Sequence, residues 1–333
     1  MRSVFFVALV LTALAVTLIS QPVLCSDIDS KAGTTGYGFL KIGAGARPVA
    51  MGGAFAGVRG DIHCSYWNPS GLAWIEAKQA TATYRNYLLD IQSGFIGYTQ
   101  PYKNMGVFGI TVQYVNYGNI DQIDFNETTG QIEHGGSFGA HDIAIGLSYG
   151  RLVTDEISVG ATLYPLIRES IDQYSATAVA FSFGFQYHLP VEAGLTVGAA
   201  FQNLGTTLNG FTDDHKDDLP ANLKLGGGLR LAHLPILIAL DINKSIDLAR
   251  PVDLDEPNFK FNLGTEVTPN DLLHFRMGYR VNSSDLKVGS SKDTFVGFTG
   301  GFGLNLRSYT LDYALSSFGE LGFVHRITVS ALL

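Results

Sequence analysis

Residues Leu273–Val281 read LHFRMGYRV, and in this stretch apolar side chains alternate with histidine, arginine and glycine. Successive side chains on a β-strand point to opposite faces, so the stretch predicts a strand with one apolar and one polar face. The same alternation recurs in residues 259–266 (FKFNLGTE) and 179–188 (VAFSFGFQYH). From about residue 79 to the end, the pattern therefore predicts an all-β protein.

This alternation fits two architectures, a soluble β-sandwich with its apolar faces inward and a membrane β-barrel with its apolar faces toward lipid. Two features of the strands favour the barrel. The runs are mostly about 9 to 13 residues long, the length needed for a tilted crossing of the bilayer. Their polar faces carry lysine, arginine, glutamate, histidine and many glycines, as expected of a wet or plugged lumen.

The connections between the predicted strands alternate in length. Even-numbered ones, such as 101–104 and 268–270, are tight, whereas the long ones, such as 117–137 and 204–218, are all odd-numbered. Outer-membrane barrels have short turns at the periplasmic end and long loops outside. We therefore predict a transmembrane antiparallel up-and-down β-barrel of about fourteen strands. Pro165 lies inside one strand and cannot donate to the ladder, so we expect a β-bulge there. The predicted strands are 79–86, 91–100, 105–116, 138–150, 156–168, 173–189, 193–203, 219–231, 235–245, 258–267, 271–282, 293–306, 308–315 and 322–333.

The first residues predict export. Arg2 precedes an apolar run from Val4 to Ile19, followed by small residues near Cys25, which is typical of a cleaved signal peptide. We place cleavage after Cys25, and acylation of Cys25 in a lipoprotein is the alternative. Cleavage there would leave Cys64 as the one thiol, and we expect it to be a small buried side chain. The predicted division is a signal peptide at 1–25, a hatch segment at 26–77 and an outer-membrane barrel at 78–333.

The composition excludes some functions. A formal net charge of -8 argues against nucleic-acid binding, which needs a basic surface. The eight histidines are scattered and no catalytic arrangement stands at a recognisable spacing, so we expect no enzyme, no cofactor and no metal site. The densest polar cluster, residues 213–218, could hold a cation or a partner, but it lacks the ligand spacing of a calcium loop, which favours a solvated external loop. Its candidate residues are Asp213, Asp214, His215, Asp217 and Asp218.

The segment before the barrel, from about residue 34 to 75, does not alternate and is rich in small residues that allow close packing and sharp turns. Gly43 and Gly45 superficially suggest a dinucleotide-binding loop, but Pro48 occupies the third glycine position and no strand clearly precedes them. Asn68-Pro69 favours a turn, which either leads into the first strand or ends a hatch that lies in the lumen and controls passage. The residues that define this motif are Gly43, Arg47, Met51, Gly52, Gly53, Trp67, Asn68, Pro69 and Gly71.

These residues carry a resemblance to a known family. The block from Phe39 to Leu72, with its Met51-Gly52-Gly53 and Trp67-Asn68-Pro69-Ser70-Gly71, resembles the opening of PorV/PorQ family outer-membrane proteins, which are similar to FadL-type fourteen-stranded transporters. The ending, residues 311–326, resembles the same family. Ser70 stands where FadL-type proteins usually have alanine, and the chain ends in Leu333 rather than the aromatic residue that the barrel assembly machinery commonly reads.

The resemblance implies two functions. As a PorV-like protein, the barrel would sit in the outer-membrane lipid as an accessory of type IX protein secretion, and its long external loops would contact the secretion machinery and secreted cargo. As a FadL-like protein, it would transport a long-chain fatty acid or another hydrophobic small molecule through the hatch. The end motifs and the short chain favour the first function; a structural barrel without transport activity is a third.

Overall fold

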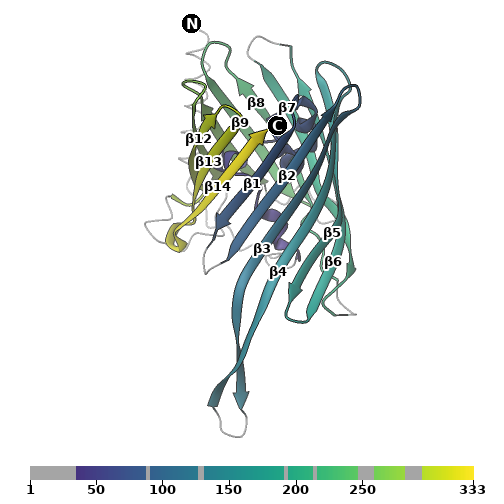
Figure 1. The fold of residues 1–333 in the computed structure, drawn as a ribbon, viewed down its shortest axis with the longest axis vertical. Helices are drawn as coiled ribbons and strands as arrows, with labels where there is room; N and C mark the ends of the chain where they lie inside the picture. Colours follow the sequence, from purple (N-terminus) through teal and green to yellow (C-terminus); the bar gives the residue numbers. More distant parts are fainter. Residues whose placement is uncertain are drawn as a thin grey trace. The chain divides into compact units, whose positions relative to one another are not determined.

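The computed structural model describes residues 35–87, 91–126, 131–190, 194–212, 216–246, 259–281 and 295–333. Within them the chain forms one closed barrel of fourteen antiparallel strands, each paired with its neighbours in sequence, and β1 pairs with β14 to close the sheet (Figure 1). This confirms the predicted barrel. The strands are β1 Gln79–Asn86, β2 Gln92–Tyr102, β3 Gly106–Asn126, β4 Gln131–Leu152, β5 Ile157–Ile171, β6 Tyr174–His188, β7 Leu195–Asn209, β8 Asn222–Arg230, β9 Ile236–Ser245, β10 Phe259–Val267, β11 Leu273–Val281, β12 Phe298–Leu306, β13 Tyr309–Ser317 and β14 Phe323–Leu332.

The apolar faces of the strands point outward. Phe181, Phe183 and Phe185 of β6 are 40%, 40% and 42% exposed, whereas Ser182 and Gln186 between them are 2% and 0% exposed. A soluble sandwich would bury the phenylalanines and expose the polar residues, so this arrangement excludes that alternative. The outer surface is the one that acyl chains solvate in an outer-membrane barrel.

The predicted loop at 117–137 is wrong. β3 and β4 stay paired as far as Asn126 and Gln131, with register shifts between Asn116 and Asn119 and between Gln122 and Ile123. The two strands extend past the neighbouring strand ends as a two-stranded ribbon (Figure 1). The polar and glycine-rich sequence resembles a loop because this part of the ribbon needs no lipid-facing side chains; backbone pairing with the adjacent strand holds it.

Pro165 lies at an irregularity of β5, as expected. The pairing of β5 with β6 shifts register between Tyr164 and Ile167, and the pairing with β4 shifts between Ile145 and Leu147. Since proline has no N–H to give to a ladder, the strand bulges where the sequence places it.

The N-terminal segment, residues 35–77, lies inside the barrel (Figure 1). It contains four short helices: η1 Gly38–Lys41, α2 Ala46–Ala50, α3 Cys64–Trp67 and η2 Pro69–Trp74. α2 contacts β11 to β14, and η2 contacts β3 to β6, so the segment touches opposite parts of the wall. Among the described residues no helix has the length and apolar character to cross a membrane. The predicted signal peptide and residues 26–34 of the predicted hatch lie outside the described residues.

Candidate functional site

The turn at Asn68 connects the N-terminal segment to the barrel wall. The fully buried Asn68 side chain accepts hydrogen bonds from the Ser70 N–H (3.3 Å) and hydroxyl (2.7 Å). Its amide donates to the Ala56 carbonyl (2.7 Å) and the Phe185 carbonyl of β6 (3.3 Å). Asn68 therefore caps η2, with Pro69 at the first helical position, and fixes two parts of the segment against the wall.

Trp67 explains two of the predicted glycines. Its indole N–H donates to the Ala44 carbonyl (2.9 Å), and its ring lies against Gly43 and Gly53, which have φ angles of +79° and +80°. A Cβ at either glycine would come within 3.0 Å of the ring. Only glycine suits both the left-handed backbone and the space beside the indole.

Glycines on the barrel wall accept the backbone of the segment. A Cβ at Gly160 of β5 would overlap the Pro69 carbonyl, one at Gly184 of β6 would overlap the Asn68 side chain, and one at Gly278 of β11 would overlap the Gly52 amide. The Gly52 N–H also donates to the Thr299 hydroxyl (3.0 Å). At Gly160 and Gly278, main chain therefore lies directly on main chain, and at Gly184 the Asn68 side chain occupies the space that a Cβ would need.

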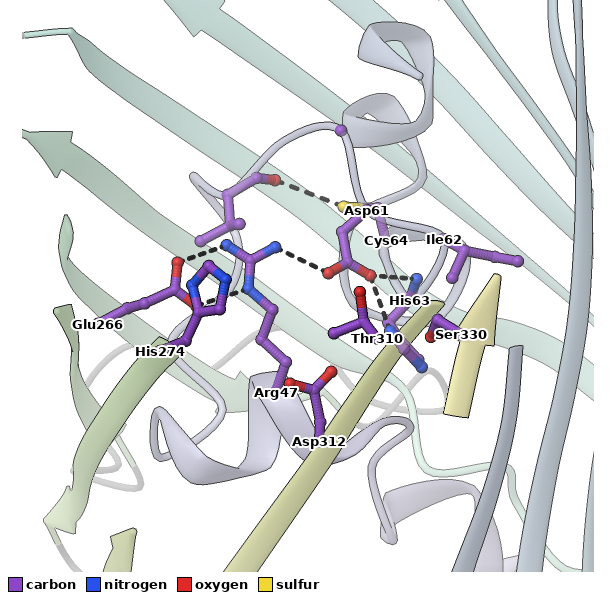
Figure 2. Close-up of polar contacts among 12 residues, drawn as sticks. Arg47, Asp61, Ile62, His63, Cys64, Glu266, His274, Thr310, Asp312 and Ser330 are labelled. Atoms are coloured by element: carbon purple, nitrogen blue, oxygen red, sulfur yellow. Dashed lines mark hydrogen bonds and ion pairs between the residues drawn. The ribbon is translucent and has the colours of Figure 1, made fainter. Parts of the chain in front are cut away.

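A chain of ion pairs joins the segment to three strands on the short-turn side. Arg47 of α2 donates to both oxygens of Glu266 on β10 (2.8 Å each) and to Asp61 (2.9 Å). Figure 2 shows Arg47 between the two carboxylates. Arg276 of β11 bonds Glu266 (2.7 Å) and Asp312 of β13 (2.6 Å). Glu266, Arg276 and Asp312 are buried, so the pairs reinforce one another in a region of low dielectric.

Within the N-terminal segment, this series of ion pairs ends at Asp61. Its Oδ1 accepts from the His63 N–H (2.8 Å) and contacts the His63 ring nitrogen Nδ1 (2.7 Å), as Figure 2 shows. Burial raises the pKa of Asp61, but His63 and Arg47 outweigh it and hold that pKa well below its usual range. Burial lowers the pKa of Arg47, yet Glu266 and Asp61 raise it well above its ordinary value. Both partners therefore stay charged.

A second buried ion pair holds another part of the segment. Lys224 of β8 lies 3.1 Å from Asp241 of β9 and donates to the Gly53 carbonyl (3.0 Å). Asp241 accepts the N–H groups of Phe55 (2.7 Å) and Ala56 (3.0 Å). The pair thus satisfies backbone groups at the end of the Gly52-Gly53 turn.

Two cavities lie on opposite sides of the segment. One, of about 310 Å³, is lined by Tyr66 and Trp67 of the segment and by strand ends that adjoin the long connections. The other, of about 280 Å³, is lined by Arg47, Asp61 and His63 and by strand ends at the short turns. Within the segment, Met51 and Phe55 are fully buried. Residues of the segment therefore line a cavity on the long-connection side and another on the short-turn side.

The structure brings the nine predicted motif residues together in this segment. Of the predicted acidic loop, Asp213, Asp214 and His215 lie outside the described residues. Asp218 of this loop forms a β-bridge to Thr35 of the segment, and the Asp217 carbonyl accepts a hydrogen bond from the Thr207 hydroxyl (2.5 Å). No group of three or more potential metal ligands occurs among the described residues.

Cys64 is fully buried in the same segment. Its thiol donates to the Val58 carbonyl (3.5 Å), and Gly71 lies so close to its sulfur that a Cβ there would clash. Burial raises the pKa of the Cys64 thiol well above its ordinary value. The prediction that Cys64 is a small buried side chain is confirmed.

Sequence reasoning missed the wall partners of this site. Glu266 and Arg276 fall on the polar faces of their runs, which predicts that they face the lumen. Their partners depend on the path of the segment through the barrel, which the alternation does not encode. Lys224 and Asp241 carry the same signal and were missed for the same reason.

The closed fourteen-stranded barrel has the fold of several solved transporters and channels. The toluene transporter TodX of Pseudomonas putida has the same fold (12% identity over 87% of this chain and 96% of that chain, TM-score 0.58). The monoaromatic hydrocarbon channel CymD also has this fold (12% identity over 88% of this chain and 98% of that chain, TM-score 0.58). So does the toluene transporter TbuX of Ralstonia pickettii (13% identity over 86% of this chain and 97% of that chain, TM-score 0.55). No curated protein sequence matches.

The family model of the type IX secretion system protein PorV matches residues 25–246, about two thirds of the chain. The chain belongs to the PorV family. Its function is therefore that of a type IX secretion outer-membrane barrel, and the fold it shares with hydrocarbon transporters does not by itself assign it their ligands.

Proposed function

We propose that this protein acts in type IX secretion as a closed barrel that receives cargo with its external surface and passes it on, without conducting a substrate through its lumen. The observation that carries the proposal is the double anchoring of the N-terminal segment. The Arg47 ion pairs hold it from one side, Lys224 and Asp241 hold it from another, and wall glycines receive its backbone between them.

The contact surface we propose is the long-connection end, above all the β3–β4 ribbon. This ribbon reaches beyond the other strands and exposes Ile120 and Ile123, 38% and 62% accessible. Exposed apolar side chains on a projecting element mark surfaces that bind other proteins.

The test uses a deletion strain and three complementing genes: the natural sequence, a variant with residues 118–136 replaced by a two-residue turn, and a variant with Met105 replaced by serine in a short turn. We expect secreted cargo to accumulate in the periplasm of the deletion strain and of the ribbon variant, and to reach the surface in the other two. Normal cargo display in the deletion strain would refute the proposal. Loss of labelled palmitate uptake with normal cargo display would instead support the hydrophobic-conduit alternative.

A further inference from the structure

Two buried arginines lie opposite one another where β1 and β14 close the barrel. Arg85 of β1 is the direct antiparallel partner of Arg326 of β14. Their side chains are 6% and 4% exposed. Like charges placed directly opposite on neighbouring strands repel one another, and burial strengthens the repulsion because water screens it less. The closure of the barrel therefore carries two positive charges that need compensation.

The contacts of these arginines supply no negative charge. Neither guanidinium forms an ion pair with any residue that the structure describes. Arg326 donates to the carbonyls of Gly45 (3.3 Å) and Ile42 (3.2 Å), which are neutral acceptors. The guanidinium of Arg85 lies 4.4 Å from the centre of the Tyr87 ring, and its buried Nε has no hydrogen-bond partner. Arg85 therefore has an unused donor as well as an unbalanced charge.

Other buried cations of the lumen have carboxylate partners. Glu266 lies between Arg47 and Arg276 and bonds both. Asp241 lies 3.1 Å from Lys224. A buried charge without a partner of opposite sign is strongly destabilising. The arginine pair at the β1–β14 closure therefore indicates that an anion is bound there.

A small cavity adjoins both guanidiniums. Its volume is about 10 Å³, the space of one occupant the size of a water molecule. Ser93 of β2 lines it and can donate from its hydroxyl, whereas the amide of Gln113, also in the lining, already donates to the Phe39 carbonyl (2.7 Å). No acidic residue occurs among the described residues that line the cavity. This volume is too small for phosphate, sulfate or a carboxylate, and it admits a monatomic ion.

We propose that this cavity binds a single halide ion, with chloride as the natural ligand. The Arg85 Nε and the Ser93 hydroxyl donate to the ion, and its negative charge offsets both guanidiniums. A water molecule would accept a hydrogen bond from the Nε but would leave both positive charges unbalanced. Because Arg326 also holds two carbonyls of the N-terminal segment, the ion stabilises the closure of the barrel and the attachment of the segment together.

Diffraction from crystals of the full-length barrel grown in sodium bromide locates the site directly. Bromide is a halide with an absorption edge within reach of X-ray sources, so it stands in for chloride. We expect one anomalous peak beside the Arg85 Nε and the Arg326 guanidinium. Absence of a peak at this position overturns the proposal. The crystals contain the natural sequence, so the result does not depend on the folding of a variant.

Thermal unfolding of the purified barrel in detergent measures binding in solution, as sodium chloride replaces sodium gluconate at constant ionic strength. We expect the midpoint to rise by roughly 5 °C when chloride reaches about 100 times its dissociation constant, because only the folded state binds it. Arg85→Leu should abolish this rise. Arg151→Gln, which changes an exposed arginine at the end of β4, should retain it in full.

The comparison between the two variants removes general effects of salt, since both experience the same buffers. An equal chloride-dependent rise in Arg85→Leu and the natural protein would overturn the proposal, and so would the absence of any rise in the natural protein. Both measurements use purified protein, so their failure is distinguishable from failure of the proposed role in secretion.

Discussion

Arg47→Ala should loosen the N-terminal segment without unfolding the barrel. Arg47 makes three charged hydrogen bonds to Asp61 and Glu266, and its side chain is 19% exposed. Removing one partner of a buried ion pair costs about 3 to 5 kcal/mol. Asp61 retains His63 and Glu266 retains Arg276, so we place the cost at the lower end, about 3 kcal/mol. At 1.4 kcal/mol per tenfold change, the opening equilibrium of the segment rises by a factor of about 150.

The assay is the rate at which Cys64 reacts with a maleimide in the folded barrel, in a Cys25→Ser background. Cys64 is fully buried within the packed segment, so it reacts only when the segment opens. When reclosing is fast, the labelling rate follows the opening equilibrium. We therefore expect labelling of the Arg47→Ala variant to be about 150 times faster. The barrel itself should still show the mobility shift on heating that marks a folded outer-membrane protein.

Arg59→Ala is the matched control. Arg59 belongs to the same segment but lies over the Trp74 ring, 4.2 Å from its centroid, and forms no carboxylate pair within the described chain. Its labelling rate should stay within threefold of the unsubstituted protein. Equal rates for Arg47→Ala and Arg59→Ala would show that the ion pairs do not hold the segment, and the reasoning would fail.

Four further outcomes follow from the same contacts. Because the pKa of Asp61 is depressed in the folded protein, the stability it contributes is complete above about pH 4 and is lost as the pH falls through that depressed pKa. Trp67 fluorescence should therefore change only below about pH 4. A transition above about pH 5 would contradict this. Gly160→Ala should lower the folded yield by overlap with the η2 backbone, at about 1 to 3 kcal/mol, whereas Gly300→Ala, with no neighbour closer than 3.8 Å, should be neutral in the same heat-modifiability assay. Met277→Arg, in the middle of the lipid-facing side of β11, should cost about 2 to 4 kcal/mol in urea unfolding from lipid, and Leu273→Arg at its end about 0 to 1. In planar bilayers the unsubstituted protein should be almost non-conducting, and porin-like steady conductance would disprove a closed lumen.

The barrel could be predicted from the sequence because lipid imposes a period of two on every strand. The runs around Phe183 and Phe275 show this signal without any knowledge of their partners. The β3–β4 ribbon could not be predicted, because outside the bilayer the constraint ends and a paired strand has the composition of a loop. Strand pairing there depends on the neighbouring strand, which a single-sequence pattern does not contain.

The candidate site shows the same division. Gly43, Gly53 and Trp67 could be recognised as a local motif, since glycine permits the positive φ angles that sharp turns need and other residues rarely adopt. The partners of Arg47 could not be found, because Asp61 and Glu266 are separated from it by 14 and 219 residues and meet it only inside the closed barrel.

Polar and charged contacts join the N-terminal segment of this protein to the wall of its lumen. A path for an apolar molecule needs an apolar surface and a segment that can yield. Here the segment is joined to the wall by Arg47 with Glu266 and by Asp241 with two backbone amides, and the lining of the larger cavity includes amides and cations beside apolar residues. Moving the segment would break the Arg47–Glu266 pair and remove two backbone amides from Asp241, while Glu266 keeps Arg276 and Asp241 keeps Lys224. Loss of the Arg47 pair alone would cost about 3 kcal/mol. Since buried charges are expensive to maintain for stability alone, we interpret them as fixing the segment in one position, which leaves the external surface as the part of the molecule free to exchange partners.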